Sequence, residues 1–340
     1  MLVGASHAVH LLGYARPASG PSAVLLRPDG ACELLVPAYE VAAAEEAGVE
    51  GVIGYGDGTM GHDLAPTRTL SEAAARAVNA RRVGVAGPFA DAIVAQAGAE
   101  AVPIDDLVAQ VRAIKDDDEV ERTARAQRLC LAAQDAVRAA AHTGAAEIEL
   151  LTLAHATVQD GAGAPVQFGG DLLSGARSAL VGGPVAVAGR ARVADGDVVL
   201  ADLYAEVDGY WGDTARATIV GERPEAEAVR DSIVELLDEV AAQLRPGLEP
   251  DRAYALVAEG IAARHPDGEF RHHAGHGLGL TPYEPPYLAP GVQEPLAPGM
   301  LVAVEPGVYF PGRFGVRHEN VYLITEDGAR DLTTTGPRDG

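Results

Sequence analysis

The sequence predicts an α+β protein that consists of a smaller α/β domain over residues 1–113 and a larger domain over residues 114–340. A chain of 340 residues is long enough for two domains, each with its own core. Strand-like and helix-like stretches alternate in the first third of the chain. The acidic run Lys115-Asp116-Asp117-Asp118-Glu119 then marks a boundary, because acidic side chains favour the start of a helix.

The first 113 residues read as a compact alternation of strands and helices. Asp29-Gly30 is a hairpin signal between the first two strands. No catalytic residue types cluster in this part, so we expect it to serve packing, oligomer contacts and one wall of a site. The expected strands cover Ser22–Arg27, Cys32–Val36, Val52–Tyr55 and Arg82–Ala86, and the expected helices cover Ala38–Ala47 and Ser71–Asn79.

The larger domain begins with helices and ends in strands and loops. We interpret its acidic start as a helix cap, since a charge run this short seldom forms an interaction tail. The apolar residues of the later helices recur at helical spacing, as Ile233, Leu236 and Leu237 do. Helices are expected over residues 116–141, 145–159, 224–244 and 250–264, with strands between the second and third of these.

Composition excludes several classes of function. The formal net charge of −23 disfavours nucleic acid and anionic membranes as partners. No stretch approaches the ~18 uninterrupted apolar residues of a membrane span. The first 14 residues lack the basic start of a signal peptide, and the two cysteines, Cys32 and Cys130, show no metal-binding spacing. A cytoplasmic protein is therefore expected.

Two aspartates stand near an expected hairpin. Asp202 follows the apolar run Val198–Ala201, and Asp208-Gly209 is a turn signal before Asp213. A four-residue loop would set Asp202 opposite Asp213, roughly 5 Å away, whereas a two-residue loop would make them diagonal neighbours, roughly 7–8 Å apart. A three-residue loop would put them on opposite faces. In the first two arrangements a divalent cation would relieve the repulsion between the carboxylates.

Two glutamates repeat this pattern near the C-terminus. Glu305 follows the apolar run Leu301–Val304, and Glu319 lies beyond a Pro- and Gly-containing segment at Tyr309–Phe314. A second hairpin would bring the two glutamates opposite each other, with Pro306 disturbing the ladder.

His276 completes the set of candidate ligands. It stands between Gly275 and Gly277, which allow the backbone to approach another group closely. Four carboxylates and one imidazole suit two divalent ions bridged by carboxylates. Manganese or cobalt suits such an oxygen-rich site, and zinc is an alternative. The candidate metal ligands are Asp202, Asp213, His276, Glu305 and Glu319.

Around these ligands the chain resembles the family of creatinase, aminopeptidase P, prolidase and methionine aminopeptidase, whose fold is named pita-bread. The resemblance implies a pita-bread catalytic domain, preceded by a creatinase-like α/β domain as in prolidase and aminopeptidase P. It also implies a homodimer. The matching motifs are Asp202 with Asp213–Arg216, Gly275–Gly279, Glu305–Tyr309, Gly315–Glu319 and the junction Arg112–Lys115.

The chain departs from this family pattern in two places. Tyr283 stands where the peptidases have a histidine shortly after the Gly-His-Gly motif, and a second family histidine aligns near Gly182. Tyr283 can donate a hydrogen bond to an oxyanion but cannot act as an imidazolium. Arg177 replaces a usual asparagine, and it is either a bidentate carboxylate ligand or a plain surface arginine. His272 matches a histidine of aminopeptidase P-like members.

The resemblance implies a dinuclear metallohydrolase that cleaves an Xaa-Pro peptide bond in small peptides. Glu305 is the candidate general base, and His272 or Tyr283 would stabilise the oxyanion. Arg317 would orient Glu319 or a substrate carboxylate. One alternative is hydrolysis of a small non-peptide amide, lactam or amidine on the same metal core. Another is an inactive binding protein derived from a peptidase, which metal stoichiometry would distinguish.

Overall fold

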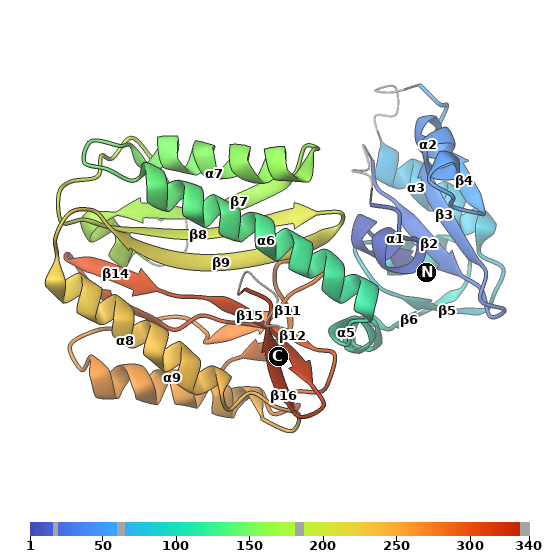
Figure 1. Cartoon of the computed structure of the whole chain (residues 1–340). Coiled ribbons are helices and arrows are strands. Elements are labelled where there is room, and N and C mark those ends of the chain that lie inside the picture. The colour runs from blue at the N-terminus through green and yellow to red at the C-terminus, as the bar shows by residue number, and fades with distance from the viewer. Residues whose placement is uncertain (16–19, 60–64, 181–186, 334–340) are drawn as a thin grey trace. The chain divides into compact units, whose positions relative to one another are not determined.

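The protein folds into two compact units that divide between Val111 and Arg112. The computed structural model describes residues 1–15, 20–59, 65–180 and 187–333 (Figure 1). Each unit has its own buried apolar clusters. Helices and sheets occur in both, and the sheets are antiparallel in the larger unit and mixed in the smaller one, which confirms the predicted α+β class. No helix within these residue ranges is long and apolar enough to cross a membrane.

The smaller unit contains a four-stranded sheet in the order β1-β2-β3-β4 and a parallel pair, β5-β6. The predicted hairpin at Asp29-Gly30 is confirmed, since β2 and β3 pair antiparallel across it and Gly30 takes a positive φ of 89°. The strands are β1 (Leu2–Val3), β2 (Ala23–Leu26), β3 (Cys32–Pro37), β4 (Val52–Tyr55), β5 (Arg82–Val85) and β6 (Glu100–Pro103).

The smaller unit has more helix than the sequence predicted. Three helices, α1, α4 and α5, were not expected, because each is nine residues or fewer and offers little periodicity to read. The helix expected from Ser71 begins five residues earlier, where Pro66 takes the first helical position. The helices are α1 (Ala5–Leu12), η1 (Ala38–Glu40), α2 (Val41–Glu46), α3 (Pro66–Ala77), α4 (Ala90–Gln96) and α5 (Asp105–Ala113).

The larger unit begins with the long helix that the acidic run predicted. Asp116 accepts a hydrogen bond from the backbone N–H of Glu119 at 2.9 Å, and Glu119 accepts one from Asp116 at 3.1 Å. This capping box confirms that the acidic run is a helix cap. The helices of this unit are α6 (Asp117–Ala140), α7 (Glu147–Ala162), η2 (Gly175–Ala179), α8 (Pro224–Ala241) and α9 (Pro250–Arg264).

Three sheets lie between the helices of the larger unit, in the orders β7-β8-β9, β11-β10-β12-β15-β16 and β13-β14. All of their strand pairs are antiparallel. The strands are β7 (Gln167–Ser174), β8 (Val198–Val207), β9 (Tyr210–Ile219), β10 (Gly275–Gly277), β11 (Glu284–Leu288), β12 (Leu301–Val304), β13 (Gly307–Phe310), β14 (Phe314–Arg317), β15 (Asn320–Thr325) and β16 (Gly328–Asp331).

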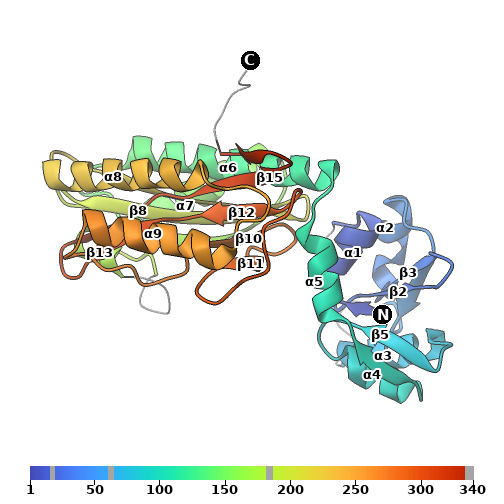
Figure 2. The same ribbon diagram turned by 90° about the horizontal axis from the view of Figure 1, so that it is seen from below.

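Helices cover the sheets of the larger unit from two sides. Helices α6 and α7 lie along the β7-β8-β9 sheet, and α8 and α9 lie side by side beyond β12 and β14 (Figures 1 and 2). One apolar cluster fills the space below α6 and α7, and a second packs α8 and α9 against the strands near the C-terminus. The strands between these helix pairs carry the polar residues of the candidate site.

Candidate active site

The β8–β9 hairpin places Asp202 and Asp213 on one face of its sheet. Asp202 pairs with Ala215, and Tyr204 pairs with Asp213, so the two aspartates are diagonal neighbours. Of the three loops considered, the two-residue loop is therefore correct. Asp208 and Gly209 both take positive φ, 54° and 83°, which is the turn that closes a two-residue hairpin, and this fixes the register.

Helix α6 holds the β9 strand at Asp213. The side-chain amide of Gln127 donates to the carbonyl oxygen of Asp213 at 2.7 Å and accepts from its N–H at 2.9 Å. Gln127 is fully buried, so water does not compete for these bonds. The Asp213 backbone is thus fixed independently of any ligand that its side chain binds.

Glu305 and Glu319 lie between two ladders that share one register. Val304 pairs with Asn320 on one side, and Gly307 pairs with Arg317 on the other. Continuing this register sets the two glutamates opposite each other, with Pro306 in the interruption. The N–H of Glu305 donates to Ala274 at 2.9 Å, and that of Glu319 donates to Ala215 at 3.1 Å. The first bond brings Glu305 to the histidine segment, and the second brings Glu319 to β9.

His276 presents one nitrogen to these acids. Its Nε2 lies 3.9 Å from Asp213 and 3.7 Å from Glu305, while its Nδ1 is 3.0 Å from the carbonyl of Gly277. The carbonyl must receive the proton, so the Nε2 lone pair faces the carboxylates. Burial lowers the pKa of His276, which keeps the ring neutral. Gly275, at φ 155°, permits this approach because a Cβ there would collide with the Ala303 carbonyl.

A divalent cation fits the resulting group of acids. One ligand atom each from Asp213, His276 and Glu319 lies within 4.8 Å of the others. Within the described part of the chain, Asp213 Oδ1 and Glu319 Oε1 are buried and have no hydrogen-bond partner. Burial and mutual repulsion raise the pKa of both carboxyls well above the usual range. Buried oxygens without partners and with such pKa shifts are suited to bind a metal ion.

Asp202 differs from the other acids because a positively charged side chain of the protein forms an ion pair with it. The Arg317 guanidinium bonds Asp202, and its Nη1 lies 3.7 Å from Glu305 Oε2. Arg317 was expected to orient Glu319 or a substrate carboxylate. Its hydrogen bonds go to Asp202 and Tyr309 and not to Glu319, and the substrate contact stays a prediction. Burial raises the pKa of Asp202 to about 6, although Arg317 opposes this rise. Arg317 therefore orients Asp202 and offsets part of the negative charge near Glu305.

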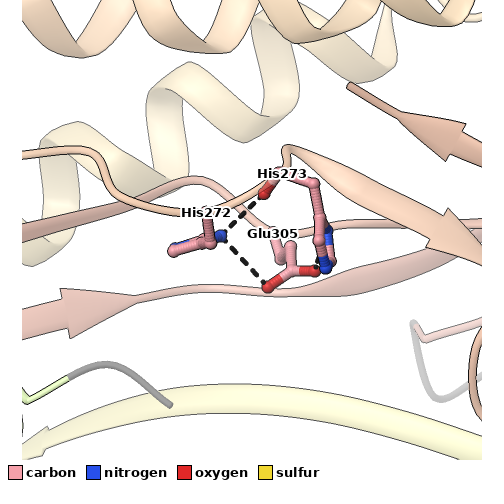
Figure 3. A group of neighbouring side chains, drawn as sticks. All are labelled: His272, His273 and Glu305. Atoms are coloured by element: carbon pink, nitrogen blue, oxygen red, sulfur yellow. Dashed lines mark hydrogen bonds and ion pairs between the residues drawn. The ribbon is translucent and has the colours of Figure 1, made fainter. Parts of the chain in front are cut away.

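Two consecutive histidines contact the two carboxylate oxygens of Glu305, one histidine on each oxygen (Figure 3). His272 Nδ1 lies 3.5 Å from Oε2, and His273 Nδ1 lies 3.2 Å from Oε1. Burial raises the pKa of Glu305, but the close contact with His273 and the neighbouring His272, Arg317 and His276 side chains outweigh it and hold the pKa at about 2. Glu305 is therefore ionised at neutral pH.

A directed chain of hydrogen bonds fixes His272. Arg317 Nε donates to the Tyr309 hydroxyl at 2.8 Å, and that hydroxyl lies 2.9 Å from His272 Nε2. His272 Nδ1 in turn lies 2.7 Å from the His273 carbonyl, which can only accept. His272 thus carries its proton on Nδ1 and receives one from Tyr309. Burial lowers its pKa to about 4, in keeping with a neutral ring.

Tyr283 lies against His276, with ring centroids 4.2 Å apart. Its side chain is about half exposed at the start of the Tyr283–Leu288 segment. Burial and the nearby acids raise its pKa, so the hydroxyl keeps its proton and can donate. Both nitrogens of His272 form hydrogen bonds within the protein. The Tyr283 side chain, in contrast, is partly exposed, and its ring lies against that of His276. The choice between the two expected oxyanion donors stays a prediction, and the engaged nitrogens of His272 leave Tyr283 as the candidate.

A buried ion pair anchors the strand that follows Tyr283. Lys115 Nζ lies 2.6 Å from Glu284 Oε1, and Arg112 Nη2 lies 3.2 Å from Oε2. Thr281 adds a hydrogen bond to Oε2 at 3.2 Å. Because Glu284 pairs with Gly277 in the β10–β11 ladder, this network holds Tyr283 beside the His276 strand.

Arg177 is bound by the protein itself. Its Nε lies 3.1 Å from Oε1 of the fully buried Glu147, and its Nη2 donates to the Val187 carbonyl at 2.7 Å. This environment favours the reading in which Arg177 is not a substrate ligand. Gly182, the other position of departure, lies outside the described residues.

The sequence did not reveal several residues of the site. His273 contacts Glu305, but it had no role predicted from the sequence. Gln127, Tyr309 and Glu284 also had no predicted role. The two histidines in a row were the single usable signal, since residues beside a metal-binding histidine lie near its acidic partners.

Comparisons with known proteins identify relatives along most of the chain. Residues 121–326 match the sequence profile of metallopeptidase family M24. An Xaa-Pro dipeptidase of Pyrococcus furiosus is 32% identical over 237 residues, which cover 68% of this chain and 66% of that relative. Prolidase from Pyrococcus furiosus has a similar structure, with a TM-score of 0.83, 25% identity, and coverage of 98% of this chain and 96% of that one. An Xaa-Pro dipeptidase from Bacillus anthracis gives a TM-score of 0.83 at 26% identity, over 98% and 93% of the two chains.

Proposed function

Because this chain belongs to metallopeptidase family M24, we propose that it hydrolyses the Xaa-Pro bond of short peptides, as a dipeptidase or aminopeptidase. One observation carries the proposal most directly. Asp213, His276 and Glu319 converge with unpartnered buried oxygens, and Glu305 stands beside them in ionised form. The named relatives supply the substrate class, and the chain spans about two thirds of the length of the curated Xaa-Pro dipeptidase that it matches.

We propose that two divalent ions occupy this site, with manganese or cobalt preferred and zinc an alternative. Their ligands would be Asp202, Asp213, His276, Glu305 and Glu319, a set rich in oxygen donors. When bound, the ions would polarise the scissile carbonyl and lower the pKa of the attacking water.

The protein's own residues would then move the proton and orient the substrate. Glu305 is ionised and would accept a proton from the water, then deliver it to the leaving nitrogen. The Tyr283 hydroxyl would donate a hydrogen bond to the developing oxyanion. Arg317 would hold Asp202 in place through its guanidinium.

The assembly and location are also proposals. Family resemblance supports a homodimer, which light scattering of the purified protein tests. A cytoplasmic location follows from composition and stays a prediction until fractionation of the source cells.

The deciding experiment measures hydrolysis of Xaa-Pro dipeptides and tripeptides by protein loaded in turn with Mn²⁺, Co²⁺ and Zn²⁺. Glu305→Ala serves as the inactive control, and metal content is measured in each preparation. Cleavage by the wild type alone supports the proposal. Metal-loaded protein that cleaves no member of the panel contradicts it and directs the search to small non-peptide amides.

A further inference from the structure

His273 connects the acids of the site in two directions. Its side chain reaches Glu305, with Nδ1 3.2 Å from Oε1. Its backbone carbonyl receives the Nδ1 proton of His272 at 2.7 Å. That proton ends the chain that starts at Asp202 and runs through Arg317 and Tyr309. One residue therefore joins Asp202, on β8, to Glu305, beyond β12.

The oxygen that His273 holds is the one that faces the cation ligands. Glu305 Oε1 lies 3.7 Å from His276 Nε2, whereas Oε2 lies toward His272 and Arg317. A carboxylate can rotate about its last bond unless both oxygens are held. The His273 contact fixes the oxygen whose direction matters for the ion and for the attacking water.

A metal ion held by His272, His273 and Glu305 is a weaker reading of the same cluster. Their ligand atoms lie close enough for one ion. However, His272 Nδ1 donates its proton to a carbonyl, and its Nε2 receives one from Tyr309, so neither nitrogen has a free lone pair. The cluster then offers two residues that could bind a metal ion, His273 and Glu305, instead of three. A role for His273 as the ion-pair partner of Glu305, with Nδ1 3.2 Å from Oε1, suits the geometry better.

We propose that His273 is a positioning residue, which holds Glu305 Oε1 through Nδ1 so that the carboxylate meets the cation and the water in one orientation. This inference rests on the proposed function, because Glu305 is there the general base. Hydrogen bonds from outside the ligand set typically change metal affinity or activity by about 10–100-fold.

The first test replaces His273 with alanine. We expect kcat for an Xaa-Pro dipeptide to fall by about 10–100-fold, with KM little changed, because Glu305 loses its orientation while the rest of the site remains. We also expect Mn²⁺ affinity, measured by titration calorimetry, to fall within the same range. His142→Ala, at an exposed histidine on the same unit, is the matched control.

Two amide variants separate positioning from bulk. In His273→Asn the side-chain nitrogen occupies the place of Nδ1, so it can hold Glu305 and should recover at least about ten-fold of the lost kcat. His273→Gln carries its amide one bond further and should recover little. A melting temperature equal to the wild type, measured without metal, shows that each variant is folded.

The outcomes distinguish this inference from the proposed function. A wild type that binds no divalent metal and cleaves no peptide contradicts the proposed function. An active wild type with equal kcat and metal affinity in His273→Ala overturns the positioning role alone. Rescue by Gln as complete as by Asn also overturns it, since it shows that occupied volume suffices. If the wild type binds metal but cleaves nothing, the Mn²⁺ affinities of the variants still decide.

Discussion

Two groups of buried carboxylates in the larger unit are surrounded in different ways. Glu284 has a cation on each oxygen, with Lys115 at 2.6 Å and Arg112 at 3.2 Å. Asp213 and Glu319 are buried more deeply, yet one oxygen of each has no partner within the described residues. Both groups lie near His276, one on the strand beside it and one facing its ring.

The difference shows how a structural acid can be told from a ligand. A buried charge that the protein neutralises itself has no need of a further ion, and removing its partner is costly. Buried charges left together without a cation repel each other and leave oxygens unsatisfied, a state that an added metal ion relieves. This contrast assigns Glu284 to holding the strand and makes Asp213 and Glu319 the candidates for binding the metal ion.

The largest effect should come from removing one unsatisfied acid. Asp213→Asn takes away a ligand, so kcat/KM should fall by more than about 100-fold, the upper range for residues outside the ligand set. The metal-free variant should also melt at a higher temperature than the metal-free wild type, because repulsion is relieved. Glu284→Gln is the matched control and should keep its metal while losing stability. Equal metal affinities in Asp213→Asn and the wild type would contradict the comparison.

Breaking the satisfied group should destabilise the fold without removing the metal. Lys115→Met leaves Glu284 buried with Arg112 alone, and we expect a loss of about 3 kcal/mol in the free energy of unfolding, at the lower end for a broken buried pair. Urea unfolding measures this loss. The double variant Lys115→Met with Glu284→Leu should recover part of it. A single variant as stable as the wild type would show that the pair is not a structural anchor.

The pH dependence of the metal-free protein should reveal the raised pKa of Asp202. The pKa of Asp202 rises from the ordinary 3.8 to about 6 in the folded state, so the folded protein holds more protons than the unfolded chain between these pH values. The contribution of Asp202 to stability should therefore fall by about 3 kcal/mol as pH rises from about 4 to about 6, while the lowered pKa of His272 acts in the opposite direction.

This pH effect is measured by melting the chelator-treated protein across that range. Asp202→Asn should flatten the slope, because the titrating group is gone. Added metal should stabilise more strongly at higher pH, since its ligands must be deprotonated. If the difference in the free energy of unfolding between the wild type and Asp202→Asn stays constant from pH 4 to pH 6, the assignment is contradicted.

The smallest effect concerns Arg177, which was one expected substrate ligand. Arg177→Ala should lower the free energy of unfolding by about 1 kcal/mol, because the arginine is partly exposed. Glu147 keeps its bonds from Ser174 and Gly189. The value of kcat/KM should not change. A rise in KM for dipeptides, but not for the same peptides with an amidated C-terminus, would restore the substrate role.

The sequence predicted the elements whose signals are local. The capping box at Asp116 and the spacing of Ile233, Leu236 and Leu237 were readable because a helix repeats within a few residues. The Asp208-Gly209 turn signal limited the hairpin between Asp202 and Asp213 to three possible registers. The observed register, with a two-residue loop, is one of them.

The pairings that the sequence could not predict join distant segments. Lys115 and Glu284 are 169 positions apart, and Arg317 and Asp202 are 115 apart. The sequence around a charged residue does not show which oppositely charged residue it will pair with. Several such residues are possible partners until the fold brings one of them close. The contact between His273 and Glu305 likewise depends on the backbone hydrogen bond from Glu305 to Ala274. That bond forms only when the two segments come together in the folded protein.

Lys115 has a consequence for work with this protein at the bench. It is the single lysine of the sequence, and its side chain is 1% exposed in the ion pair with Glu284. Amine-reactive dyes, cross-linkers and resins will therefore find no reachable ε-amino group on the folded chain. Acylation of Lys115, followed by mass spectrometry, would instead count the molecules that have opened, which turns the chain's one lysine into a built-in reporter of unfolding.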